Sequence, residues 1–248
     1  MSSGRDPVRR KVICVVHSEW STTGRIGRIL REGGHEEVRC CLKTGDVLPQ
    51  NFHDIAGAII FGGPMSANDD GTLDFIAAEL RWIDRVLEAG TPFFGVCLGA
   101  QMLARSLGAA VKPREDGWHE IGFTQLVPTE SGRSALGDLR HVYQWHGEGF
   151  DLPGGCELLA TSVTEHFPNQ MYSCGPSVYG VQFHPECTID MIGEWMKEGA
   201  EELDEKGAQQ PEEQLADAGR YDHLVDAWLP GFFERWLGAA ESGRMAAE

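Results

Sequence analysis

Hydrophobic residues in the first 110 positions alternate between short continuous runs and helical spacing. Apolar runs typical of buried strands lie at 12–16, 57–61 and 92–96, and a further strand candidate lies at 37–42. Segments typical of helices, which end at or close to a glycine, lie at 25–31, 73–89 and 101–107. Because strands and helices alternate, we expect an α/β fold with an open, mainly parallel sheet and helices on both of its faces.

Between residues 111 and 183 the pattern changes to short β-like runs separated by glycine and proline turns. These runs lie at 122–127, 142–145, 157–160 and 177–183. We interpret them as a short antiparallel extension of the same sheet.

The C-terminal part of the chain is expected to contain a helix, an exposed loop and an apolar stripe. The helix is predicted over 190–205, the loop over 209–213, and the stripe, which should pack back on the domain, over 221–237. A length of 248 residues fits one large domain, which we place at 8–240. The two ends are expected to be flexible, at 1–7 and 241–248.

The charge balance limits the class of partner. The chain has 38 acidic and 21 basic residues, which gives a formal net charge of −17. Such a surface repels phosphate backbones and anionic lipids, so we expect no nucleic acid and no membrane as partners. No apolar segment approaches the roughly 18 residues that a membrane-spanning helix needs. A small molecule is the expected ligand.

Cysteine usage indicates a redox compartment. The chain has seven cysteines, an odd number, and their spacing is not typical of disulfides. This usage is typical of a reduced protein, which we expect in the cytoplasm. The first apolar run, 12–16, is too short for the core of a secretory signal.

One cysteine lies in a distinctive context. Cys97 stands between Gly95 and Gly99, after an apolar strand and before a helix, which is the cysteine version of a nucleophile elbow. The turn would expose the thiol at the edge of the sheet, and the helix N-terminus would favour the thiolate. The backbone N–H of Leu98 would be a first donor to an oxyanion. The alternative is a small buried cysteine, as we interpret the other six.

A histidine and a carboxylate follow the last β-like run. His184 lies at its end, and Glu186 can reach back to one imidazole nitrogen, which leaves the other nitrogen facing a thiol. The alternative is a histidine of the surface or the core. We expect no metal and no other cofactor, because neither HExxH nor a cluster of His and Cys occurs.

A glycine pair ends the third strand. The backbone N–H of Gly63 could be a second oxyanion donor, whereas Pro64 has no N–H to offer. An ordinary turn is the alternative for this loop.

Three segments, 60–64, 95–101 and 180–186, are distinctive in combination. Together they resemble the class I (triad-type) glutamine amidotransferase family. The resemblance covers roughly residues 10–190 and looks closest to free-standing members similar to the amidotransferase domain of GMP synthase. It implies a flavodoxin-like architecture and a triad of Cys97, His184 and Glu186.

The resemblance also implies the oxyanion hole and the binding of the α-amino-acid end of the substrate. The oxyanion donors would be Gly63 and Leu98. The residues that bind the substrate would be Gln101, His146, Gly147 and Glu148, of which the last three act largely through backbone groups. The Glu148 carboxylate could also pair with the substrate ammonium, although a solvated surface carboxylate is the alternative.

The leading hypothesis is therefore hydrolysis of the γ-glutamyl amide of glutamine through a cysteinyl thioester, which releases ammonia and glutamate. Only 62 residues follow Glu186, and none of them forms a Ser-Gly-Gly-rich phosphate loop. We therefore expect no built-in synthetase, and ammonia would pass to a separate synthetase subunit. The alternatives are a free-standing γ-glutamyl peptidase or hydrolase and a non-catalytic regulatory module.

Overall fold

A nine-stranded sheet forms the centre of the molecule, in the order β2-β1-β3-β4-β11-β10-β9-β6-β7. The structure, a computed structural model, describes residues 10–245. The strands that pair in parallel are β2 (Glu36–Cys40), β1 (Lys11–Val15), β3 (Ile55–Ile60), β4 (Phe93–Val96) and β11 (Val178–Val181). The strands that continue the sheet antiparallel are β10 (Met171–Ser173), β9 (Glu157–Ser162), β6 (Glu120–Pro128) and β7 (His141–His146). The predicted parallel sheet with an antiparallel extension is confirmed, except that the run at 177–183, assigned to the extension, forms β11 and pairs in parallel with β4.

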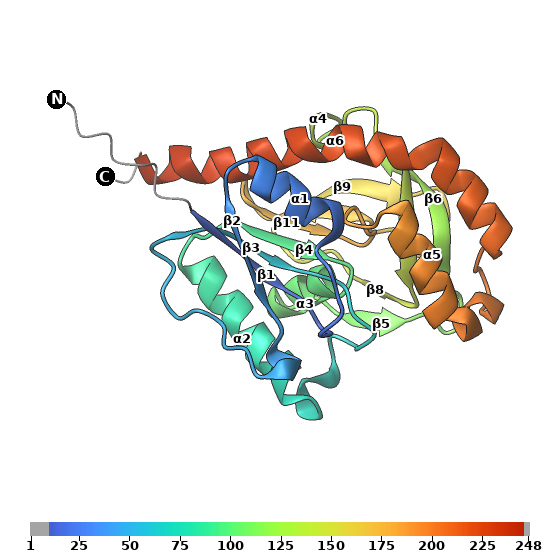
Figure 1. Cartoon of the computed structure of the whole chain (residues 1–248), viewed down its shortest axis with the longest axis horizontal. Helices are drawn as coiled ribbons and strands as arrows, with labels where there is room; N and C mark the ends of the chain where they lie inside the picture. Colours follow the sequence, from blue (N-terminus) through green and yellow to red (C-terminus); the bar gives the residue numbers. More distant parts are fainter. Residues whose placement is uncertain (1–9, 246–248) are drawn as a thin grey trace.

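Helices cover both faces of the parallel part of the sheet (Figure 1). One face carries α1 (Gly24–Glu32) and α6 (Pro211–Met245), and the other carries α2 (Asp74–Glu88) and α3 (Leu98–Ser106). The packing of strand β1 on both faces explains why its run is continuously apolar. Val12 and Cys14 join the core under α1 and α6, whereas Ile13 and Val15 join the core under α2 and α3.

The antiparallel part has a third core beneath α5 (Ile189–Glu198). Here Ile121 and Tyr143 of the sheet pack with Ile192 and Met196 of the helix. Four short elements were missed by the sequence pattern, namely α4 (Arg133–Leu136), β5 (Val111–Pro113), β8 (Glu148–Phe150) and β10. Segments of three or four residues are too short to display a period.

The predicted helix over 190–205 is wrong beyond residue 198. Helix α5 ends at Glu198, and a separate 3-10 turn follows at Ala200–Asp204. Between them lies Gly199, where a Cβ would come within 2.6 Å of the indole of Trp145. The same indole donates to Glu202 Oε2 at 2.8 Å. A contact from a distant strand thus divides a segment that has a helical pattern.

The predicted exposed loop over 209–213 is also wrong. Helix α6 begins at Pro211, a residue favoured in the first turn of a helix. The Gln209 side chain accepts a hydrogen bond from the Phe123 backbone N–H at 2.7 Å, which ties this segment to β6.

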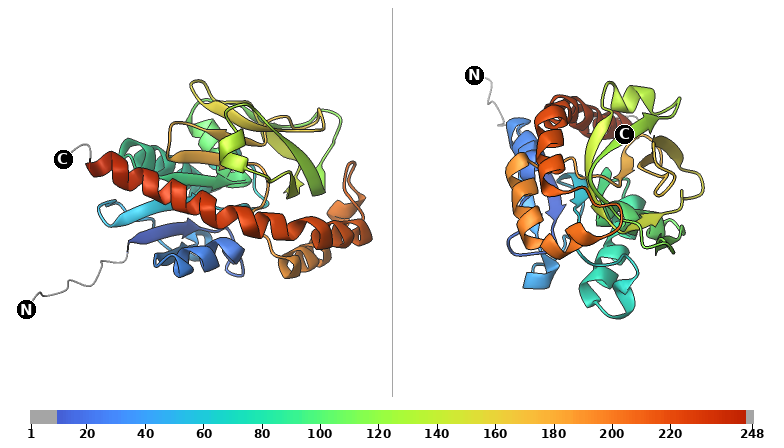
Figure 2. Two further views of the ribbon diagram at one scale, coloured as in Figure 1. Left: turned by 90° about the horizontal axis from the view of Figure 1, so that it is seen from above. Right: turned by 90° about the vertical axis from the view of Figure 1, so that its right-hand side faces the viewer.

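The predicted packing of the stripe over 221–237 is confirmed. It lies within α6, which runs along the molecule in the views of Figure 1 and Figure 2. Phe232, Phe233 and Trp236 of α6 surround Phe94 of β4. Residues 241–245 continue this helix, while the expected flexible ends at 1–7 and 246–248 lie outside the described residues.

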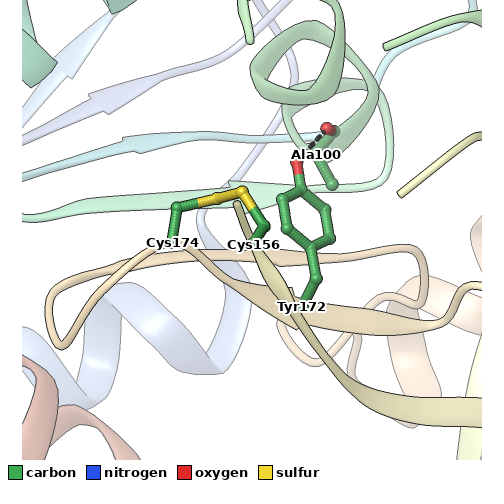
Figure 3. The surroundings of a disulfide bond; sticks show 4 residues. All are labelled: Ala100, Cys156, Tyr172 and Cys174. Atoms are coloured by element: carbon green, nitrogen blue, oxygen red, sulfur yellow. Dashed lines mark hydrogen bonds between the residues drawn. A yellow bond between two sulfur atoms is a disulfide. The ribbon is translucent and has the colours of Figure 1, made fainter. Parts of the chain in front are cut away.

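Two cysteines are joined, which corrects the expectation that all of them are reduced. Cys156 and Cys174 form a disulfide across the ends of β9 and β10, beside Tyr172 (Figure 3). Glu157 pairs with Ser173 in this antiparallel ladder, so the two flanking cysteines are brought together by register rather than by sequence spacing. The five other cysteines are free and buried.

The cytoplasmic location rested on the cysteine argument and stays a prediction. Over residues 10–245, none of the helices combines the length and the apolar character that crossing a bilayer requires.

Removing the disulfide should destabilise the fold. The bond closes a loop between residues 18 positions apart, so its loss enlarges the unfolded ensemble. We expect the double variant Cys156→Ala/Cys174→Ala to lose about 3 kcal/mol in free energy of unfolding under non-reducing conditions. Urea unfolding followed by tryptophan fluorescence measures this. Dithiothreitol should lower the stability of the wild type toward that of the variant, and equal stabilities without reductant would contradict the prediction.

Candidate active site

The chain turns sharply at Cys97, between the end of β4 and the start of α3. Its φ of 49° makes it the one non-glycine residue with positive φ in the described part of the chain. A non-glycine residue in this region carries backbone strain, which persists only where the surroundings hold it. The Cys97 N–H donates to Val181 O at 2.8 Å, which anchors the turn to β11.

The two glycines around Cys97 are required by close approaches of the backbone. A Cβ on Gly95 would lie 2.5 Å from Gly99 O, and a Cβ on Gly99 would lie 2.0 Å from Ile60 O. Only glycine lets α3 leave the sheet this tightly. The geometry is that of the expected nucleophile elbow, and Leu98 is the first residue of α3. The expected exposure of the thiol is wrong, because Cys97 is buried.

His184 and Glu186 form a buried pair next to the elbow. His184 Nδ1 lies 2.8 Å from Glu186 Oε1, and their side chains are 4% and 3% exposed. His184 Nε2 is buried and has no hydrogen-bond partner among the described residues. A Cβ on Gly62 would touch both His184 Cε1, at 2.7 Å, and Cys97 Cβ, at 3.5 Å. The structure therefore brings the histidine, the thiol and the glycine loop together.

The electrostatic environment favours the imidazolium form of His184. Burial by itself lowers the pKa of His184, because it disfavours the charged ring. The negative charges of Glu186 and of the Cys97 thiolate outweigh burial and raise that pKa well above its usual 6.5. The site can thus hold a thiolate beside an imidazolium, with a proton available at Nε2.

The residues expected to bind substrate form a connected segment. Gln101 Nε2 donates to Glu148 O at 2.9 Å, and His146 Nδ1 lies 3.0 Å from the same oxygen. Gln101 and His146 are buried, so they hold the backbone around the half-buried Gly147. The Glu148 carboxylate accepts a hydrogen bond from Ser66 Oγ at 2.8 Å, which joins it to the loop after β3.

Some residues at the site were missed by sequence reasoning. Glu120 is buried, with Oε2 3.3 Å from His146 Nε2. Burial alone raises the pKa of Glu120, but the interaction with His146 and hydrogen bonds from Thr164 and Gln170 lower it overall. Gln182 Nε2 donates to Cys97 Sγ at 3.7 Å. Gln182 stands inside one of the three matching segments, which is a signal that could have found it.

A buried arginine holds the segment after His184. The Arg25 N–H donates to Glu186 O at 3.0 Å, and the Arg25 guanidinium donates to Cys187 O at 3.0 Å. The same guanidinium pairs with Asp222 and, at 3.0 Å, with Asp226 of α6. These partners are far from Arg25 in the sequence, so no local signal indicates this role.

The loop after β3 packs against His17, a histidine that follows β1. A Cβ on Gly63 would lie 2.9 Å from the ring of His17, so this glycine is packed directly on that histidine. The Tyr172 hydroxyl donates to Ala100 O at 2.8 Å and ties α3 to the antiparallel strands (Figure 3). The site therefore draws on both parts of the sheet.

Comparison with known proteins places this chain in a family. The family model described as glutamine amidotransferase class-I matches residues 25–197. A glutamine amidotransferase-like protein of Salmonella typhimurium, YfeJ, is 28% identical over 78% of this chain and 82% of its own length. A glutamine-hydrolysing GMP synthase of Alteromonas mediterranea is 35% identical over 67% of this chain. The match spans only 32% of that synthase.

Solved structures agree with this assignment over nearly the whole chain. A glutamine amidotransferase of Thermotoga maritima superposes with a TM-score of 0.82 at 28% identity, covering 92% of this chain and 98% of the other. A glutamine amido transferase of Methylobacillus flagellatus superposes with a TM-score of 0.84 at 27% identity, covering 94% and 95%. The flavodoxin-like architecture is thus confirmed.

The pKa of His184 should depend on Glu186. Replacing Glu186 with Gln removes the first of the charges that raise this pKa, so it should fall in the variant. NMR titration of labelled histidine side chains measures the change. Glu148→Gln, which changes a carboxylate that His184 does not contact, is the matched control. An unaltered titration of His184 in Glu186→Gln would contradict the electrostatic account.

Proposed function

The chain belongs to the class I glutamine amidotransferase family, and on this premise we propose that it hydrolyses the γ-glutamyl amide of glutamine through a thioester on Cys97. The observation that carries the proposal is the geometry at the elbow. A strained cysteine at a helix N-terminus stands beside a histidine whose other ring nitrogen is held by Glu186. This is the arrangement that nucleophilic acyl transfer needs.

The first half of the reaction forms the thioester. The Cys97 thiolate attacks the side-chain carbonyl carbon of glutamine, and the backbone N–H groups of Gly63 and Leu98 hold the developing oxyanion. His184 donates its Nε2 proton to the departing nitrogen, and ammonia leaves as the carbonyl re-forms. Glu186 keeps Nδ1 protonated and directed, so the proton that moves is the one on Nε2.

The second half regenerates the enzyme. His184, now neutral at Nε2, takes a proton from water, and the hydroxide attacks the thioester carbonyl. The same two backbone donors hold the second oxyanion. The Cys97 thiolate then leaves, glutamate is released, and His184 is again the imidazolium.

Recognition of the amino-acid end of the substrate is assigned to the 146–148 segment. Glu148 is half-buried and its Oε2 is already oriented by Ser66, so the carboxylate can pair with the substrate α-ammonium. Gln101 and His146 act on the Glu148 carbonyl and thereby fix the segment. The released ammonia would pass to a separate synthetase subunit.

A second candidate function is hydrolysis of γ-glutamyl peptides. The half-buried indole of Trp195 packs edge-on against the His184 ring, with centroids 4.9 Å apart. It offers an apolar surface close to the nitrogen that His184 protonates. Ammonia makes no use of such a surface, whereas the remainder of a peptide could pack on it.

Loss of the Cys97 thiol should abolish turnover. In Cys97→Ala no thioester can form, and we expect glutamate release to fall by about three orders of magnitude or more. A coupled glutamate assay measures the rate, and mass spectrometry of the quenched wild type detects the acyl-enzyme. Cys40→Ala, at a buried free cysteine in β2 away from the site, is the control and should remain active. Near-normal glutamine hydrolysis by Cys97→Ala would refute the assignment.

A direct substrate comparison separates the two candidate functions. With glutamine as the natural substrate, kcat/KM should be higher for glutamine than for γ-glutamyl peptides. Trp195→Ala should leave the ratio of the two kcat/KM values within about threefold, because the loss of packing on His184 affects both substrates alike. Steady-state assays on both substrates measure this. A preference for peptides that is lost selectively in Trp195→Ala would instead establish the peptidase.

A further inference from the structure

A third buried histidine–carboxylate pair lies behind the glycine loop, and the mechanism above does not use it. His17 follows β1, and Glu79 projects from α2. His17 Nε2 lies 3.0 Å from Glu79 Oε2, and each side chain is 1% exposed. The other ring nitrogen, Nδ1, lies 2.9 Å from the carbonyl oxygen of Gly62. Both ring nitrogens of His17 are therefore engaged.

The chemistry of these partners fixes the proton positions. A carbonyl oxygen only accepts hydrogen bonds, so Nδ1 of His17 must carry a proton to bind Gly62. The contact between Nε2 and the Glu79 carboxyl also needs one proton, whichever of the two atoms holds it. The Gly62 carbonyl thus excludes the neutral tautomer whose Nδ1 lone pair would face it, and Glu79 fixes the ring by binding Nε2.

This hydrogen bond sets the orientation of the Gly62–Gly63 peptide. In a planar trans peptide the C=O of one residue and the N–H of the next point in opposite directions. With Gly62 O held by His17, the Gly63 N–H points away from His17. The same loop adjoins the reacting centre, because a Cβ on Gly62 would come within 2.7 Å of His184 Cε1 and 3.5 Å of Cys97 Cβ. A donor that points away from His17 is the one that can reach an oxyanion on Cys97.

The loop would not hold this orientation by itself. Neither Gly62 nor Gly63 has a side chain to hinder rotation of the peptide between them. A rotated peptide would present the Gly62 carbonyl oxygen to the oxyanion, and the repulsion would replace a stabilising hydrogen bond. Because Gly63 packs directly on the His17 ring, the loop also has no room to move toward His17.

We propose that His17, oriented by Glu79, is a positioning residue that locks the Gly62–Gly63 peptide with its N–H toward the oxyanion formed on Cys97. The inference rests on the proposed function in one respect, that Cys97 is acylated. It adds that the second oxyanion donor is held by side chains from β1 and α2, which lie outside the three segments that define the family resemblance. His17 itself touches neither substrate nor thiol.

The test compares two reactions of Cys97, of which one needs an oxyanion donor. Acetylation by p-nitrophenyl acetate passes through a tetrahedral oxyanion, whereas alkylation by iodoacetamide is a direct displacement at carbon and forms none. The ratio of the two rates therefore reports the oxyanion hole independently of thiolate reactivity. Rates with Cys97→Ala are subtracted, which removes the reaction of other groups.

His17→Leu removes both hydrogen bonds, and His17→Asn keeps a donor near the place of Nδ1. We expect His17→Leu to lower the acetylation rate by about tenfold to a hundredfold, less than the complete loss of an oxyanion donor, with alkylation within about twofold of wild type. His17→Asn should restore most of the acetylation. Glutamine turnover should fall in kcat with KM unchanged, since the interaction is made only in the transition state.

Two further variants guard against a purely structural effect. Ile83→Ala removes a buried apolar side chain from the same helix as Glu79 and removes neither hydrogen-bond partner of His17, so its ratio should equal that of wild type. Glu79→Gln is nearly isosteric and should give an intermediate loss of acetylation. It therefore tests the positioning role even where His17→Leu does not fold.

The outcomes separate this inference from the proposed function. An unchanged ratio in His17→Leu and Glu79→Gln, an equal fall in Ile83→Ala, or no recovery in His17→Asn would overturn the positioning role. Wild-type protein that is acetylated normally but turns over neither glutamine nor γ-glutamyl peptides would overturn the proposed substrate. In that case the ratio of the acetylation and alkylation rates would still decide whether His17 has the positioning role.

Discussion

The strained turn at Cys97 is the constraint on which the rest of the structure depends. Its positive φ is tolerated because β4 lies between β3 and β11 and because Cys97 N–H is bound by Val181 O. The close approach of Gly99 to Ile60 O shows how tightly α3 is drawn onto the sheet. That approach sets the thiol at the ends of the central strands, where His184 and the glycine loop also arrive. A looser turn would separate these groups, and proximity is the main contribution that such a site can make.

Each segment at the site is held by a buried polar side chain from elsewhere in the fold. Arg25 binds the carbonyl oxygen that follows Glu186, His17 binds the carbonyl of Gly62, and Gln101 binds the carbonyl of Glu148. These contacts share one principle, because each binds a backbone oxygen and so fixes the direction of a peptide rather than of a side chain. In a poorly solvated interior such hydrogen bonds are strong, and their loss leaves an unpaired polar group. Helices α1, α2 and α6 therefore contribute to the site although they do not face a substrate.

Much of the fold could be predicted from the sequence, because both faces of the parallel sheet are buried and its inner strands β1, β3 and β4 are consequently continuous apolar runs. The three segments around Gly63, Cys97 and His184 were recognisable for a related reason. The backbone there lies so close to neighbouring atoms that only glycine fits, and glycines therefore occur at a fixed spacing. The failures share a cause as well. The helix predicted over 190–205 is divided at Gly199 by the indole of Trp145, and the loop predicted over 209–213 is tied down by Gln209 on β6. The Cys156–Cys174 disulfide depends on strand register, which spacing along the chain does not reveal.

The sequence by itself determined the order of strands and helices, the elbow cysteine and the histidine–carboxylate pair, because period, glycine spacing and local reach are properties of neighbouring residues. Tertiary structure alone decided which other polar side chains serve the site. His17 and Glu79 are 62 positions apart, and Arg25 meets Cys187 across 162 positions, so only the packing of helices on the sheet makes them partners. The tertiary structure also turned Gln101 and His146 inward, onto the carbonyl of Glu148. A buried polar group must find a partner wherever the fold provides one, and sequence distance does not limit that choice.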